Sequence, residues 1–195
     1  FVKESVFKSL RDGNSIVYLA TEESPSMVID SMRKFGWDIS EYMRTDKLRI
    51  VDAFSYRSNK PSESKYYIDN PENLSDVSIT VEEAKKGFSN LRFVMDSITS
   101  LTLNVGPGLG QKFMQTVTGR LKAAKALGIC VLDVGILDET FLNFLRFIFD
   151  GVIEMAITED EGRLKRRIRV YSLKLGRHDT SWHEFQITNA GISIS

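Results

Sequence analysis

The sequence has few of the residues that build disulfide-linked or metal-bridged scaffolds. Cys130 is the single cysteine in 195 residues, and this excludes an intramolecular disulfide. With only two histidines as further ligands, a zinc centre is not expected. The 195 residues show no run long and apolar enough to span a bilayer, and no signal-peptide pattern. We therefore expect a cytoplasmic protein that does not contact a membrane.

The sequence also lacks an excess of either charge. Lysine plus arginine equals aspartate plus glutamate at 26 each, so the formal net charge is zero. A balanced chain has no global field that steers it toward nucleic acid or membrane, so any site for a polyanion must be a local patch. The length suits one α/β domain with ample material for a core. We therefore expect residues 1–195 to form a single domain.

The most informative feature present is a pair of short apolar runs that end in acid. Ser15–Ala20 leads to Glu22 and Glu23, and Leu91–Met95 is followed by Asp96. Such runs fit strands buried on both faces of a parallel sheet, where ligands bind outside the carboxyl ends of the strands. The carboxylates are then placed for a nucleotide and its magnesium. The alternative is that they simply end buried strands and cap the helices that follow.

Helical and strand patterns alternate along the chain. Apolar residues at helical spacing predict helices over 1–10, 25–35, 74–88 and 113–124, and a very apolar helical segment over 141–149. Apolar runs predict further strands over 48–53, 129–134, 152–157, 164–175, 184–188 and 191–194. Residues 56–73 read as a mobile surface segment and 102–110 as a glycine-bearing loop. The fold class is therefore α/β: a mostly parallel central sheet flanked by helices, with antiparallel C-terminal hairpin strands at its edge.

Several segments together resemble a known family. In order, they are TEESP, FGWD, LRIVDAF, VMDSITSL, FDGVIEM and FQITNAGISI. This combination resembles the KaiC-like branch of the RecA superfamily, which includes the archaeal RadA paralogues, and it covers the chain from about Phe1 to Ser195. The resemblance implies a RecA-like core that assembles side by side and holds ATP between subunits. It also implies ATPase activity, which we expect to be slow because Ser172 replaces a lysine of the family pattern, and a role in regulating homologous recombination or DNA repair.

The resemblance assigns roles to the acidic residues. Asp96 looks like the Walker B aspartate, which holds Mg²⁺ through water, and Ser97 lies beside it as in the family. Glu22 and Glu23 look like the paired glutamates that activate the hydrolytic water, with Glu23 favoured as the base. An ionised carboxylate near that water suits the task, because phosphoryl transfer needs mainly positioning and charge neutralisation.

A second set of candidates lies near the C-terminus. Where the family usually has a Lys-Met-Arg-Gly-like segment that reaches the neighbour's γ-phosphate, this chain has Ser172 in place of the first lysine. Lys174, Arg177 and His178 remain as residues that could contact a neighbour's ATP, as an arginine finger does. The alternative for Lys174 is a solvated lysine at a strand edge. A slip in the apolar phase within 164–175 predicts a β-bulge near Val170 that could aim this segment outward. The alternative is a regular strand that is covered on both faces.

The family's P-loop, G-x-x-x-x-G-K-[ST], does not occur in this sequence. Phe1 stands roughly where the residue after that motif would fall, so we expect the motif to precede it in the protein. The alternative is a degenerate paralogue. The segment 106–112 looks superficially similar but lacks the G-K-[ST] ending, and we interpret it as a flexible loop.

Self-association in a ring or filament is the first partner expectation, with single-stranded DNA or a recombinase as further candidates. The basic run over 163–169 is typical of the solvated face of a strand. By resemblance to recombinases, the loops 102–111 and 133–149 would be the DNA-binding loops, and the second holds Phe141, Phe144 and Phe147. The alternative for this apolar segment is packing on the core or on a neighbouring subunit. The alternatives are a signalling or scaffold ATPase that acts through protein partners, and a hydrolysis-deficient assembly subunit.

Overall fold

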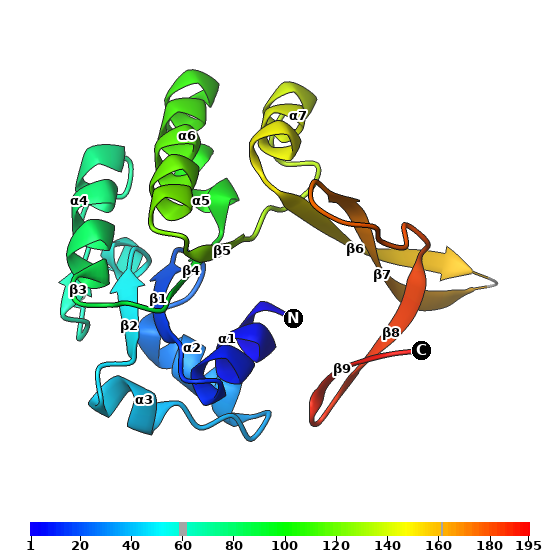
Figure 1. Ribbon diagram of the computed structural model, residues 1–195, viewed down its shortest axis with the longest axis horizontal. Coiled ribbons are helices and arrows are strands. Elements are labelled where there is room, and N and C mark those ends of the chain that lie inside the picture. Colours follow the sequence, from blue (N-terminus) through cyan, green and yellow to red (C-terminus); the bar gives the residue numbers. More distant parts are fainter. Residues whose placement is uncertain (59–61, 161) are drawn as a thin grey trace.

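The computed structural model describes residues 1–58, 62–160 and 162–195 (Figure 1). Its helices are α1 (Val2–Arg11), α2 (Pro25–Arg33), α3 (Ser40–Arg44), the 3-10 helix η1 (Ser55–Ser58), α4 (Leu74–Lys85), α5 (Ile98–Thr102), α6 (Pro107–Ala123) and α7 (Glu139–Ile148). Its strands are β1 (Ser15–Ala20), β2 (Leu48–Asp52), β3 (Tyr66–Tyr67), β4 (Leu91–Asp96), β5 (Leu127–Cys130), β6 (Gly151–Asp160), β7 (Arg163–Leu173), β8 (His183–Thr188) and β9 (Gly191–Ile194).

A parallel sheet of five strands forms the centre of the described part, in the order β3-β2-β1-β4-β5. Helices α1, α2 and α3 cover one face and α4, α6 and α7 the other (Figure 1). Successive residues of β1 serve opposite cores, as the pleat requires: Tyr18 packs with α1 and α2, and Leu19 packs with α4 and α6. Each such fully buried side chain contributes about 1.5–3 kcal/mol through the hydrophobic effect. The expected fold class is confirmed.

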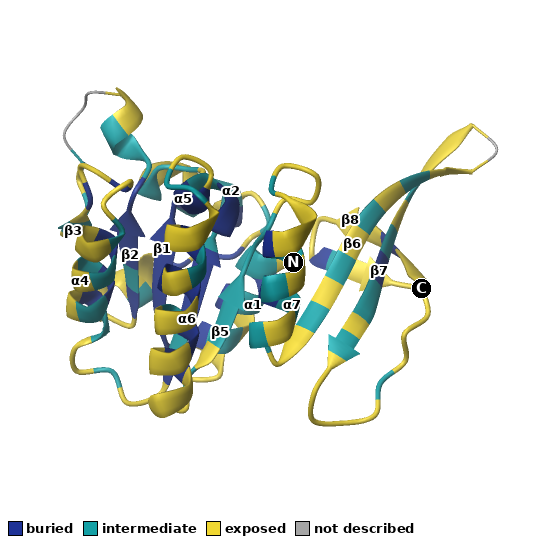
Figure 2. Cartoon of the chain, turned by 90° about the horizontal axis from the view of Figure 1, so that it is seen from above, coloured by how far each residue is buried: buried dark blue, intermediate teal, exposed yellow. Residues whose placement is uncertain are grey.

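The antiparallel strands form a sheet of their own, in the order β6-β7-β8-β9. We expected them at the edge of the parallel sheet, but β6 pairs with β7 and not with β5 in the described chain. In the long β6–β7 hairpin, the backbone N–H and C=O groups along one edge of each strand bond to the other strand. These groups therefore need no partner in the parallel sheet. Figure 2 shows the difference in burial: β1 is buried throughout, whereas β6 alternates between half-buried and exposed residues.

The predicted β-bulge is confirmed. Val152 lies opposite Ser172 and Ile153 opposite Val170, so Tyr171 is the extra residue in β7. The predicted hairpin between β8 and β9 is also confirmed, with Thr188 opposite Gly191. The bulge bends the end of β7 just before the segment that holds Lys174.

One loop prediction was wrong. Residues 107–112 are not a flexible loop but the first turns of α6. Gly106 takes φ +79° before the helix, and Pro107, whose fixed φ suits a first helical position, begins it. The segment 56–73, expected to be a mobile excursion, holds most of η1 and all of β3, while its residues 59–61 lie outside the described ranges.

Strand β5 begins and ends earlier than the predicted 129–134. Residues after Cys130 leave the ladder, although Val131 N–H still donates to Met95 O at 2.9 Å. By contrast, Ser24 caps α2 as expected: its side chain accepts a hydrogen bond from Met27 N. In the described ranges, none of the helices is both long and apolar enough to cross a membrane.

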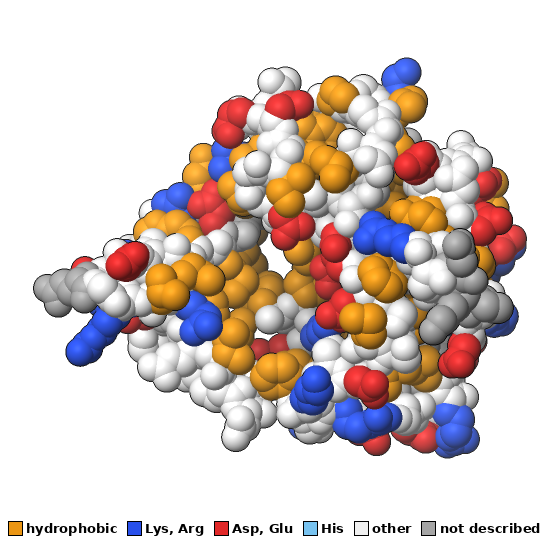
Figure 3. Space-filling model, turned by 180° about the vertical axis from the view of Figure 1, so that it is seen from behind, with side chains coloured by type: hydrophobic (Ala, Val, Ile, Leu, Met, Phe, Trp, Pro, Cys, Tyr) orange, Lys and Arg blue, Asp and Glu red, His pale blue; other side chains and the backbone are white. Residues whose placement is uncertain are grey.

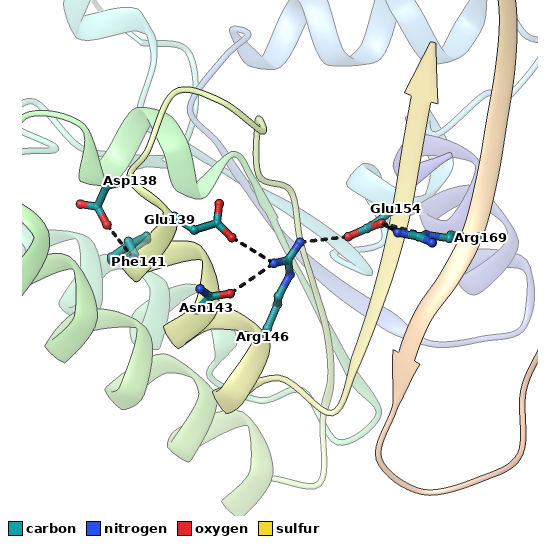
Figure 4. Close-up of polar contacts among 7 residues, drawn as sticks. All are labelled: Asp138, Glu139, Phe141, Asn143, Arg146, Glu154 and Arg169. Atoms are coloured by element: carbon teal, nitrogen blue, oxygen red, sulfur yellow. Dashed lines mark hydrogen bonds and ion pairs between the residues drawn. The ribbon is translucent and has the colours of Figure 1, made fainter. Parts of the chain in front are cut away.

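Hydrogen-bonded ion pairs connect helix α7 to the antiparallel sheet, with one carboxylate between two guanidinium groups (Figure 4). Glu154 on β6 accepts from Arg146 of α7 at 3.1 Å and from Arg169 of β7 at 2.6 Å. Asp138 caps the start of the helix by accepting from Phe141 N at 2.7 Å. These bonds explain why α7 and the sheet keep a defined mutual position although much of β6 is exposed.

Candidate active site

The sheet brings the predicted carboxylates together at its C-terminal edge. Ala20 at the end of β1 is the register partner of Asp96 at the end of β4, and Thr21 N donates to Asp96 O at 2.8 Å. Glu22 and Glu23 follow directly. Two segments that lie far apart in the sequence therefore meet because β1 and β4 are neighbouring parallel strands.

Asp96 is a half-buried carboxylate held by a tyrosine. The Tyr18 hydroxyl donates to Asp96 Oδ2 at 2.6 Å. Burial raises the pKa of Asp96 above its ordinary value; Glu23 and Glu22 add to the rise, whereas the hydrogen bond from Tyr18 and the charge of Lys3 oppose it. Burial and the charge of Asp96 likewise raise the pKa of Tyr18, so its phenol stays a hydrogen-bond donor. A cation at Asp96 would therefore relieve a concentration of negative charge.

Glu22 is held by two hydroxyl groups. Ser97 Oγ donates to Glu22 Oε1 at 2.8 Å, and Ser100 Oγ donates to the same oxygen. The Ser97 side chain also caps α5 by accepting from Ser100 N. Thr21 Oγ1 accepts from Ser97 N at 2.5 Å, and the peptide bond between Asp96 and Ser97 is cis. Ser97 thus combines a helix-capping role with a direct contact to one of the paired glutamates.

Glu23 is paired with a lysine that the sequence did not single out. Lys3 Nζ of α1 lies 2.5 Å from Glu23 Oε2 and donates to Ser31 Oγ of α2 at 2.7 Å. The first turn of a helix favours acidic residues, so Lys3 in the first turn of α1 is unusual. That exception was the one signal in the sequence that could have pointed to Lys3. Sequence reasoning also missed Tyr18. Its hydroxyl reaches Asp96 because β1 and β4 are neighbours in the sheet, and the sequence of β1 does not reveal that pairing.

A further carboxylate at this edge has a structural task. Asp52 ends β2, is fully buried, and accepts from Phe54 N and Ser55 N at 3.0 Å each and from Ser62 Oγ. Burial alone would raise the pKa of Asp52, but the hydrogen bonds from Ser62 and Ser55 lower it overall. Its oxygens are occupied by the turn that leaves β2, so we do not assign it to the site.

The oxygen-rich donor set fits Mg²⁺, which prefers carboxylate, hydroxyl and water oxygens. Among the residues that the structure describes, no three His, Cys, Asp or Glu side chains are grouped so as to hold a metal. Asp96 and Ser97 therefore suit an ion that keeps several waters and takes its other ligands from phosphate. The role of Asp96 as a ligand of Mg²⁺ stays a prediction.

The C-terminal candidates lie outside this cluster. Lys174 Nζ donates to Phe147 O at 2.5 Å and its backbone N–H to Asp150 O at 2.8 Å, so its ammonium group stabilises the end of α7. His178 Nδ1 lies 3.5 Å from Gly176 O. Within the described ranges, Arg177 is exposed and has no hydrogen bond or ion pair. Within the described ranges, the hydrogen bonds of Lys174 and His178 thus involve none of Glu22, Glu23 or Asp96.

A helix-covered parallel sheet with carboxylates gathered at its carboxyl edge defines an α/β protein whose ligand site lies at the strand ends. Residues 1–195, the whole chain, match the family described as "ATPase: KaiC". The chain belongs to the KaiC family of ATPases, and this membership implies a nucleotide ligand.

Two relatives and one solved structure are similar to the chain over most of its length. A UPF0273 protein of Pyrobaculum aerophilum is 30% identical over 98% of this chain and 69% of its own length. One of Pyrococcus horikoshii is 28% identical over 100% of this chain and 79% of its own length. The crystal structure of a KaiC-like protein of Pyrococcus horikoshii OT3 is similar with a TM-score of 0.72 at 23% identity, covering 96% of this chain and 79% of that one. The resemblance to RadA paralogues stays a prediction.

Proposed function

We propose that the protein binds Mg²⁺-ATP and hydrolyses it slowly at the C-terminal edge of its parallel sheet. The observation that carries this proposal is the convergence of Glu22, Glu23 and Asp96 through the pairing of β1 with β4. Asp96 would hold the hydrated Mg²⁺ with Ser97 beside it, and Glu23 would orient and deprotonate the attacking water. Glu22, fixed by two serine hydroxyls, would support that carboxylate pair electrostatically.

The phosphates need a further element, for which a P-loop ahead of Phe1 is our proposal. Figure 3 shows a hollow between the two sheets, with hydrophobic side chains on one wall and acidic side chains gathered on the other. The strands β5 and β6, each at the end of its sheet order, flank this region, and the N-terminus lies between the sheets (Figure 1). A strand followed by a phosphate-binding turn would occupy this hollow and lead into α1.

The experiment uses a chain that carries a P-loop ahead of Phe1. In it, Asp96→Ala and Glu23→Gln should each reduce the turnover of ATP by about a hundredfold or more, the scale of losing one catalytic group. Glu23→Gln should leave ATP affinity nearly unchanged, because it removes the base and not a phosphate contact. Unchanged turnover in both variants would refute the assignment.

We also propose that hydrolysis is completed by a neighbouring subunit. Arg177 is the most suitable finger, because Lys174 is already bonded to the end of α7 and Arg177 is exposed without a polar partner in the described chain. A finger supplied in trans makes specific activity rise with protein concentration. Activity per subunit that stays constant on dilution below the assembly range would argue against a shared site.

For the biological role, we propose regulation of homologous recombination or DNA repair through self-association and a recombinase partner. The resemblance to RadA paralogues supports this role. Phe141 is buried, and Lys165 of the basic run is paired with Asp160 and Glu184. Neither of these two residues is therefore free to contact a nucleic acid, which is compatible with a second candidate, a KaiC-type signalling or scaffold ATPase that acts through protein partners.

Binding of single-stranded DNA at low and at moderate salt separates direct DNA action from both protein-mediated roles. Phosphate contacts weaken steeply as salt rises, whereas base stacking on exposed aromatic rings is less sensitive. We expect no binding at moderate salt. Salt-resistant binding would instead support direct action on DNA. Co-precipitation with the recombinase of the same organism then distinguishes the recombination role from the scaffold role.

A further inference from the structure

In the described part of the chain, Lys3 is the one cation that forms an ion pair with a carboxylate of the proposed Mg²⁺ site. Its ammonium group lies 2.5 Å from Glu23 Oε2. Glu22 and Asp96 instead accept hydrogen bonds from uncharged hydroxyl groups, and within the described ranges neither of them has an ion pair. Three carboxylates therefore have a single positive charge beside them.

Lys3 is held in this position by two helices. It stands in the first turn of α1, and its Nζ also donates to Ser31 Oγ of α2 at 2.7 Å. The Ser31 hydroxyl in turn donates to Val28 O at 2.9 Å. The side chains of Lys3 and Glu23 are 22% and 34% exposed, so salt screens their charges less than those of a surface pair. The positive charge of Lys3 is thus fixed at the carboxylates.

The charge of Lys3 also acts on the carboxylate that we assign to Mg²⁺. Burial raises the pKa of Asp96 and the charges of Glu23 and Glu22 add to the rise, whereas the charge of Lys3 opposes it. A cation that stabilises ionised Asp96 also repels a second cation that approaches the same carboxylate. Because a bound divalent ion is the largest local charge in such a site, this repulsion weighs on Mg²⁺ most of all.

We propose that Lys3 is a built-in counter-ion of this carboxylate cluster and competes with Mg²⁺ for it. Its ammonium group neutralises Glu23 and lowers the affinity of the cluster for Mg²⁺ alone. The ion is then retained mainly when it arrives with the negative charge of the ATP phosphates. The inference rests on the proposed function for the place of Mg²⁺, but it concerns binding of the ion without nucleotide.

Stabilisation of the full chain by Mg²⁺, with no nucleotide added, tests this competition. The thermal midpoint is measured over a series of MgCl₂ concentrations at constant ionic strength, since an ion that binds the folded chain raises the midpoint by mass action. Lys3→Met removes the charge and keeps a long unbranched side chain. It should strengthen Mg²⁺ binding about tenfold or more, because one nearby positive charge is gone. An affinity that equals or falls below that of the parent overturns the proposal.

Two control variants separate the charge of Lys3 from a general effect on α1. Lys8→Met is the matched control, because Lys8 lies on the same helix and pairs at 2.6 Å with Glu4, which is not a member of the cluster. Its response to Mg²⁺ should equal that of the parent. Lys3→Arg keeps the charge and should keep the weak affinity. If Lys8→Met strengthens Mg²⁺ binding as much as Lys3→Met does, or if Lys3→Arg behaves like Lys3→Met, the proposal fails.

A double variant locates the ion. Adding Asp96→Ala to Lys3→Met should abolish the response to Mg²⁺, and a response that persists would place the ion elsewhere and overturn the proposal. Failure of this inference is distinct from failure of the proposed function. Slow ATP hydrolysis that Asp96→Ala removes would support the proposed function even if Lys3→Met bound Mg²⁺ no better than the parent.

Discussion

Gly191 and Glu4 should be strongly coupled in stability, because a carboxylate occupies the space where any other residue at position 191 would place its Cβ. Glu4 of α1 is buried and accepts a hydrogen bond from Ile192 N of β9 at 2.9 Å. A Cβ at Gly191 would lie 2.7 Å from both Glu4 Cδ and Glu4 Oε2, and Gly191 has φ +122°. The β8–β9 hairpin therefore docks on α1 through a contact that only glycine permits.

The magnitudes follow from the separate effects. Gly191→Ala should destabilise the chain by about 2–4 kcal/mol, since it adds backbone strain of about 1–3 kcal/mol and displaces the carboxylate from Ile192 N. Glu4→Ala should cost about 1.5–3 kcal/mol, because it removes a hydrogen bond to a charged group and the ion pair with Lys8 at 2.6 Å. In the double variant the collision is absent, so its cost should fall below the sum by about 1 kcal/mol or more.

Urea unfolding followed by circular dichroism measures this cycle. Glu4→Gln, which keeps the shape and removes the charge, adds a test by pH. Burial alone would raise the pKa of Glu4, but the bonds from Ile192 N–H and Lys8 lower it below its ordinary value. A depressed folded-state pKa stabilises the fold above the unfolded-state pKa, and this stability is lost as the pH falls through the folded-state value. The difference between Glu4→Gln and the parent should therefore shrink in acid. Additive single costs, within about 0.5 kcal/mol, would show that the two residues do not meet.

Two further changes test the charged clusters. Asp96→Asn should stabilise the nucleotide-free chain by about 0.5–2 kcal/mol and so raise its thermal midpoint, because it removes a half-buried carboxylate whose pKa is raised by burial. A lower midpoint would show that the carboxylate is stabilising. Glu154→Ala should cost about 1–2 kcal/mol in urea unfolding, since it leaves Arg146 and Arg169 facing each other, and the partial exposure of these groups keeps the figure modest. A neutral result would show that solvent replaces the carboxylate without loss.

The acidic ends of two buried strands could be predicted because their signals are local. An apolar β-branched run marks a strand wherever the strand pairs, and the acid that follows is placed at its carboxyl end by chain connectivity alone. The bulge near Val170 was equally local, since it shows as a change of apolar phase in one strand. The same reasoning failed for 107–112, where glycine and proline suggested a loop and instead began a helix.

Contacts between distant segments depended on the packing of the whole chain. Tyr18 bonds to Asp96 because β1 and β4 are neighbours, and Lys3 reaches Glu23 because α1 packs beside α2. The hairpin contact between Glu4 and Ile192 joins residues 188 positions apart. Hydrophobic periodicity reports which face of an element is buried and carries no information on which element covers it.

The amino-acid sequence was sufficient for the α/β class, for the two buried strands β1 and β4 and for the acidic residues at their carboxyl ends, because these follow from patterns within single elements. Tertiary structure decided that the antiparallel strands form a separate sheet, that Lys174 bonds to α7 while Arg177 stays exposed, and that a lysine and a tyrosine complete the carboxylate cluster. The physical reason is that strand pairing and helix packing are settled by competition among all surfaces of the chain at once, whereas the period of a strand or helix is set by its own backbone.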